Sequence, residues 1–225
     1  MTRALEPAAL HLERALRKPG CPLCRRIREA EERWIWNVLY ELTGDPEIHA
    51  RFAASLGLCR EHAALLAQVV EARELATPTG AARLYETAVA RALERLAGLS
   101  GRQKGLPREP CPLCAVARET EERESGFAAQ LLAAPEFWQA YVASDGFCLP
   151  HFLSVWARAP APVRPPLLRD FRERLTRLRQ RLRAFQEKER FDAGEPPTPE
   201  EVRAWREALW RLGGMGYREL LLPRG

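Results

Sequence analysis

The sequence lacks several features that would place it in a familiar class. It has no apolar run of the roughly 18 residues that a membrane-spanning helix needs. Its first residues, MTRALEPAALHLERAL, mix charged and apolar side chains, so we expect no secretory signal and a cytoplasmic, reducing location. It has no HExxH, no GxGxxG and no pattern that indicates a Ser-His-Asp triad. We therefore expect a protein that is not an enzyme.

Lysine and β-strand patterns are also scarce. Lysine occurs only at positions 18, 104 and 188, and the predominance of arginine, with much alanine, leucine and proline, is typical of a GC-rich bacterial genome. Apolar residues recur at helical spacings, and no stretch alternates as a strand would. Because 46% of the 225 residues are hydrophobic, the chain can form a packed core. The pattern predicts an all-α protein.

Cysteine and histidine are few but regularly placed. All six cysteines and two of the four histidines fall into two sets. In each set a Cys-Pro-Leu-Cys segment is followed, after more than 30 residues, by Cys-x-x-His. The candidate ligands of the first set are Cys21, Cys24, Cys59 and His62, and those of the second are Cys111, Cys114, Cys148 and His151.

Three thiolates and one imidazole form a closed tetrahedral ligand set, the usual form of a structural zinc site. We expect two Zn²⁺ ions, one held within each half of the chain. Thiolates also suit iron–sulfur clusters, so an iron–sulfur redox protein remains an alternative. A redox pair or disulfides would not explain why a histidine follows the third cysteine by three residues in both sets. We expect His11 and His49, which have no partner cysteines, to be solvated or hydrogen-bonded.

The second set belongs to an internal duplication. At an offset of 90 residues the two CPLC segments align, and so do two Glu-x-Glu-Glu-Arg segments that begin at Glu29 and Glu119. We interpret these acidic segments as solvated faces, because no Glu-x-x-His pair accompanies them as a di-metal bundle would require. The sequence predicts a first Cys3His repeat over 1–98, a glycine- and proline-rich linker over 99–110 and a second repeat over 111–166.

The remaining residues, 167–225, predict a long basic amphipathic helix, a C-terminal helix and a tail. A Pro-rich turn at 159–166 precedes the basic helix, whose apolar stripe is Leu168, Phe171, Leu175, Leu178, Leu182 and Phe185. Thr198 and Glu201 form a capping box that starts the last helix. The apolar stripe of this last helix is Val202, Trp205, Leu209 and Leu212. A further amphipathic helix is predicted in the first repeat, with an apolar stripe of Leu84, Tyr85, Ala88, Val89, Leu93 and Leu96.

The duplicated motif, CPLC followed by Gly-(Leu or Phe)-Cys-x-x-His, resembles that of a family of uncharacterised bacterial proteins of unknown function. The resemblance covers roughly residues 20–160 and rests on the eight ligands with Gly57 and Gly146. It implies zinc binding but no activity or substrate. The helical context differs from that of zinc ribbons, whose cysteine knuckles lie in β-hairpins.

Two kinds of partner fit the sequence. The first is a protein partner or a second copy of the chain, bound by a zinc-stabilised scaffold through one of the two last helices. The second is nucleic acid, bound through Arg164–Arg190, where ten basic and four acidic residues give a charge of +6. A solvated arginine face is the simpler interpretation of that segment.

Overall fold

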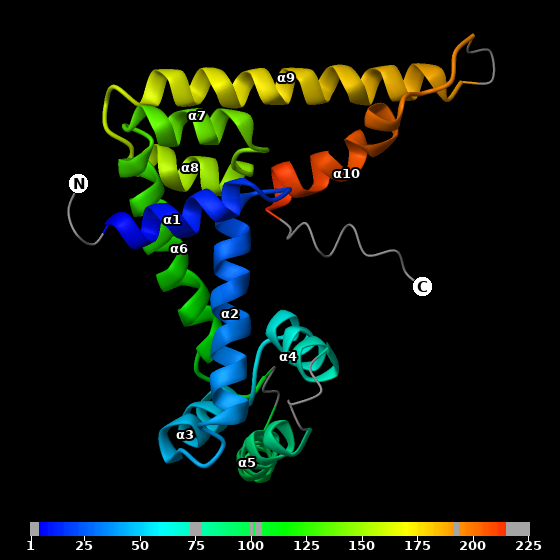
Figure 1. The fold of residues 1–225 in the computed structure, drawn as a ribbon. Coiled ribbons are helices and arrows are strands. Elements are labelled where there is room, and N and C mark those ends of the chain that lie inside the picture. Colours follow the sequence, from blue (N-terminus) through cyan, green and yellow to red (C-terminus); the bar gives the residue numbers. More distant parts are fainter. Residues whose placement is uncertain (1–4, 73–77, 100, 102–104, 191–193, 215–225) are drawn as a thin grey trace. The chain divides into compact units, whose positions relative to one another are not determined.

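The computed structural model describes residues 5–72, 78–99, 101, 105–190 and 194–214 (Figure 1). Within these residues the chain forms ten helices and no strand, which confirms the all-α class. The helices are α1 (Leu5–Leu16), α2 (Pro22–Tyr40), α3 (Pro46–Ser55), α4 (Arg60–Ala72), α5 (Pro78–Ala97), α6 (Pro112–Leu131), α7 (Pro135–Ala143), α8 (Leu149–Arg158), α9 (Arg164–Lys188) and α10 (Pro199–Gly213). Among the described helices, none combines the length and the apolar character that crossing a membrane requires.

The chain forms two compact units that differ from the two sequence repeats. Unit 1 comprises Met1–Ile27 and Glu121–Gly225, and unit 2 comprises Arg28–Thr120. The boundaries fall inside α2 and α6, not in the linker. Unit 1 therefore combines the start of the first repeat with most of the second repeat and the residues that follow it. Unit 2 contains the rest of the first repeat, the linker and the start of the second repeat.

Unit 2 packs α3, α4 and α5 with parts of α2 and α6. Asp45 caps α3 because its carboxylate accepts a hydrogen bond of 2.7 Å from the backbone N–H of Glu47. The predicted inward positions of α3, Ile48 and Phe52, are buried. Phe52 stacks on Trp34 and meets Tyr85 edge-on, at centroid distances of 6.5 and 6.0 Å. These rings form an aromatic centre for the core of this unit.

The core of unit 1 lies where α1, α7, α8 and α9 contact one another. Leu12 and Tyr141 are almost fully buried there, and Phe152 of α8 stacks on Phe171 of α9 at 4.1 Å between centroids. Helix α10 packs on α9 and α8. The predicted capping box of α10 is confirmed, since Thr198 and Glu201 exchange hydrogen bonds.

Of two predicted apolar stripes, one does not face the core and the other faces it only in part. On α10 the predicted stripe, Val202, Trp205, Leu209 and Leu212, is exposed, and the buried residues are Ala204, Trp210 and Arg211. On α5, Leu84 and Ala88 are buried, whereas Val89, Leu93 and Leu96 are exposed. Both helices carry apolar side chains on more than one face, and periodicity alone cannot select the face that packs.

The start of α9 also differs from the prediction. The helix begins at Arg164, so Pro165 and Pro166 lie in its first turn rather than in a loop. Proline is tolerated at this position because the backbone N–H groups of the first turn have no acceptor within the helix. Leu167, not the predicted Leu168, is buried, together with Phe171 and Leu178. The predicted tail, 215–225, lies outside the described residues.

Arg174 is a charged side chain inside the core of unit 1. It donates to the carboxylate of Asp170 at 2.7 Å and to the carbonyl oxygens of Ser144 and Val142 at 2.6 and 3.0 Å. These carbonyls belong to the end of α7, so the guanidinium fixes the loop that leads to Cys148. A basic residue of the predicted arginine face therefore has a structural role.

Candidate metal centres

All four ligand pairs occupy the same local position, the start of a helix. Cys21, Cys59, Cys111 and Cys148 each directly precede α2, α4, α6 and α8, and the second ligand of each pair follows three residues later in the first turn. Residues three apart on a helix lie on one face, so both donors point the same way. The N-terminus of a helix also carries a partial positive charge, which favours thiolate there.

The four pairs converge on two sites. Site A contains Cys21, Cys24, Cys148 and His151, and site B contains Cys59, His62, Cys111 and Cys114; in each, the donor atoms lie within 4.8 Å of one another. Site A belongs to unit 1 and site B to unit 2. All eight predicted ligands are thus brought together.

The prediction that each quartet forms within its own repeat was wrong. Each CPLC pair meets the Cys-x-x-His pair of the other repeat. Helix length accounts for this difference. The 19 residues of α2 extend about 28 Å, so the helix carries the chain far from Cys24 before Cys59 is reached. The spacing of three residues predicts which two ligands share a helical turn. It does not predict which distant pair of ligands completes the site.

The distances between donors fit a tetrahedral metal ion. Sulfur atoms lie 3.7 Å apart for Cys24 and Cys148 and 3.8 Å apart for Cys59 and Cys114. The Nδ1 atoms of the two histidines lie 3.1–3.5 Å from the sulfur atoms of their sites. Zinc–sulfur bonds of about 2.3 Å in a tetrahedron place two sulfurs about 3.8 Å apart. Disulfide sulfurs would be about 2.05 Å apart, and all six cysteines are free thiols.

The electrostatics of site B favour a bound cation. Burial opposes ionisation of Cys111, but hydrogen bonds from His62 and from backbone N–H groups lower its pKa to about 6. Burial and the negative charge on Cys111 then raise the pKa of Cys114 to about 12. Cys111 and Cys114 therefore cannot both ionise cheaply on their own, and a divalent cation would remove that penalty.

A carboxylate stands behind each histidine. The Oε1 atom of Glu31 lies 3.1 Å from Nε2 of His62, and Oε1 of Glu121 lies 3.8 Å from Nε2 of His151. With a metal ion bound, Nδ1 would carry no proton, and an N–H at Nε2 that donates to Glu31 would leave the Nδ1 lone pair free to bind the ion. Carboxylates in this position orient histidine ligands and increase their basicity.

These carboxylates correct the interpretation of the acidic segments as solvated faces. Glu31 is buried, whereas Glu119, Glu122 and Arg123 are exposed as expected. Glu31 and Glu121 occupy equivalent positions of the two repeats at the offset of 90 residues. In the sequence, the role of this glutamate was indicated by its duplication together with the ligands.

Backbone contacts hold the two halves of each site together. In site A, the N–H of Gly20 donates to Oδ2 of Asp145 at 2.7 Å, which joins the segments before Cys21 and Cys148. In site B, the N–H of Glu109 donates to the carbonyl of Ala54 at 3.0 Å. Each pairing of distant segments is therefore supported by a hydrogen bond as well as by the ligands.

Glycine is required in the turn before each Cys-x-x-His pair. Gly57 and Gly146 have φ angles of 85° and 73°, in the left-handed region that other residues rarely adopt. A Cβ atom would lie 3.0 Å from the ring of Tyr85 at Gly57 and 3.1 Å from the guanidinium of Arg174 at Gly146. These turns allow the chain to enter α4 and α8 with the ligands facing inward.

The two histidines outside the sites have the predicted character. His49 contacts Thr87 Oγ1 at 2.6 Å and the carbonyl of Thr43 at 2.9 Å, and His11 is exposed. Neither belongs to a metal-ligating group among the described residues.

The fold and the sites together define a helical protein with two Cys3His clusters that can each hold a metal ion. Comparisons with models of protein families, with curated proteins and with solved structures find no match to this chain.

The exchanged pairing predicts which thiols lose protection when one ligand is removed. In Cys148→Ser, we expect bound metal to fall from two ions to one, and Cys21 and Cys24 to react rapidly with a thiol reagent. Cys111 and Cys114 should stay protected. Mass spectrometry of the labelled peptides distinguishes the positions.

Cys59→Ser is the matched control for that experiment. Here Cys111 and Cys114 should react, and Cys21 and Cys24 should stay protected. Pairing within each repeat requires the opposite pattern in both variants, and that result would exclude the exchanged arrangement.

The carboxylates predict unequal effects on metal affinity. We expect Glu31→Gln to weaken binding at site B by about 10- to 100-fold, because the buried acceptor behind His62 is lost. Glu121→Gln should have a smaller effect on site A, because its carboxylate is more distant and 40% exposed. Competition with a chelator of known affinity measures both, with Glu61→Gln, an exposed neighbour of His62, as the control.

Proposed function

We propose that the chain is a non-enzymatic zinc protein in which two structural Cys3His sites stabilise a helical scaffold for a protein partner. The observation that carries this proposal is the convergence of four protein donors on each of two points. The proposed setting is the reducing cytoplasm, where thiols remain available as ligands.

The donor geometry supports zinc over an iron–sulfur cluster. All four donor atoms of each site lie within 4.8 Å of one another and surround a single point. A cluster distributes its ligands over two or more iron atoms and so needs more widely spaced sulfurs. Three sulfurs and one nitrogen in a tetrahedron are the usual donors of structural zinc.

The same geometry supports a structural rather than a catalytic metal. Catalytic zinc keeps a coordination position for water or substrate, whereas four protein donors fill all the positions of a tetrahedral ion. Each site also joins the starts of two helices that are far apart in sequence. Apparent binding free energies of about 10–16 kcal/mol at neutral pH would therefore contribute directly to folding.

An exposed apolar row on α10 supports binding of a protein partner. The row consists of Val202, Trp205, Leu209 and Leu212, which recur every three or four residues along one face. This spacing is suited to an amphipathic helix of a partner, and tryptophan is a frequent anchor residue in interfaces. The capping box at Thr198 and the packing of α10 on α9 present the row on an ordered helix.

The metal is tested directly on the purified protein. We expect two zinc ions per chain by elemental analysis, no visible absorption, and loss of cooperative unfolding with loss of helical circular dichroism after chelation, restored by adding zinc. Iron with visible absorption would instead identify an iron–sulfur redox protein. Removal of both ions without any change in thermal stability would contradict a structural role.

The partner surface is tested with a double substitution on the apolar row. Trp205→Glu with Leu209→Glu should abolish capture of a protein partner that the native chain binds, without loss of metal, because both side chains are exposed. Val89→Glu with Leu93→Glu, on exposed positions of α5, is the matched control and should retain capture. Light scattering distinguishes a second copy from a different protein, and equal binding by both variants would contradict the assignment of this row.

A further inference from the structure

The structure divides the basic residues of α9 into two groups. The first group is held by other parts of unit 1. Arg181 bonds to Glu207 at 2.7 Å, Lys188 bonds to Glu201 at 3.1 Å, and Arg164 donates to the carbonyl of Ala159 at 2.9 Å. Arg174 is buried against α7, as described above. Three of these four charges, those of Arg174, Arg181 and Lys188, are paired with carboxylates.

The second group is a row of four exposed arginines, which we call the α9 row: Arg169, Arg172, Arg179 and Arg183. Within the part of the chain that the structure describes, none of the four side chains forms an ion pair or a hydrogen bond. At 100° per residue they lie within an arc of about 80° opposite the buried face, and they extend over about 21 Å. Glu173 lies beside the row next to the exposed Arg177, which belongs to neither group, and the exposed Glu187 lies one turn beyond Arg183 on the same side.

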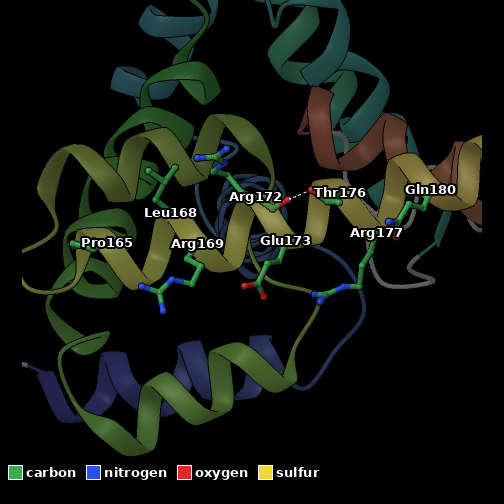
Figure 2. Close-up of a pocket in the computed structure, with 8 residues that line it drawn as sticks. All are labelled: Pro165, Leu168, Arg169, Arg172, Glu173, Thr176, Arg177 and Gln180. Atoms are coloured by element: carbon green, nitrogen blue, oxygen red, sulfur yellow. Dashed lines mark hydrogen bonds between the residues drawn. The ribbon is translucent and has the colours of Figure 1, made fainter.

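A shallow hollow follows the exposed side of α9, and all the residues that line it belong to this helix (Figure 2). Arg169 and Arg172 project from it in different directions, with Thr176 and Gln180 further along the same side. Among the described residues no second element lines the hollow, so it does not enclose a small molecule. It suits an extended ligand that lies along the helix.

We propose that the α9 row binds the phosphate backbone of duplex nucleic acid without reading its sequence. Guanidinium groups pair well with phosphate oxygens, and four unpaired arginines on one helix provide a track of such donors. No residue of the α9 row is a candidate metal ligand or a member of the apolar row of α10.

The character of the exposed side favours duplex nucleic acid over other polyanions. Single strands are held largely by stacking of bases on aromatic side chains. The two aromatic residues of α9, Phe171 and Phe185, are buried and half-buried, so none is available for stacking. A membrane-surface helix needs an apolar face, but Leu168 is the one large hydrophobic residue of α9 that is exposed.

The test is fluorescence anisotropy with the zinc-loaded full chain and a mixed-sequence 20-base-pair DNA duplex. Four phosphate contacts predict a slope of about −3.6 for the logarithm of affinity against the logarithm of salt concentration. Affinity should therefore fall by about 150-fold between 50 and 200 mM salt. The quadruple variant R169Q/R172Q/R179Q/R183Q should lose at least 10-fold in affinity at 50 mM salt and most of the slope.

The matched control is R14Q/R60Q/R83Q/R203Q, which removes the same charge from exposed positions on four other helices. It should bind nearly as well as the native chain. Metal content and melting temperature confirm that both variants are folded. An equal loss in both variants would overturn the proposal, because net charge alone would then explain binding.

Three further results would overturn it. The first is the absence of duplex binding at 50 mM salt. The second is equal or tighter binding of a single strand of the same sequence. The third is binding to vesicles of anionic lipid at conditions where the duplex does not bind, which would assign the row to a membrane surface.

Discussion

The fold is organised around the convergence of two helix starts at each Cys3His cluster. A helix start offers free N–H groups and a partial positive charge, and both favour a thiolate at the first position. Two such starts, with three sulfurs and one imidazole between them, give a site that is attractive to a divalent cation and costly without one. The core alone must otherwise hold together segments that are more than 100 residues apart in unit 1, such as those of Cys24 and Cys148.

The residues around the two sites position the ligands in a similar way in both units. A carboxylate lies next to Nε2 of the histidine, a glycine with a left-handed backbone precedes the ligand helix, and a hydrogen bond joins the two approaching segments. The repetition of these devices agrees with the duplication in the sequence. The sites are nevertheless not identical, since Glu31 is buried and close to its histidine, whereas Glu121 is more distant and partly exposed.

The sequence was informative about local structure and uninformative about long-range pairing. The eight ligands could be predicted because cysteine and histidine at a spacing of three lie on one helical face. Their assignment to sites could not, since a rigid helix as long as α2 or α6 decides which distant segment is brought close. The same distinction explains α10: Thr198 and Glu201 predicted its start, but Ala204 and Trp210, rather than the more regular stripe, face the core.

The arrangement of the two units along the chain has a consequence for biosynthesis. Unit 2 is contiguous and is inserted between the two segments of unit 1. A ribosome that works from the N-terminus releases all the donors of site B once residue 114 has emerged. Cys21 and Cys24 leave the ribosome before the donors of site B, yet they lack their partners until residue 151 has been added, so site A would be completed after site B.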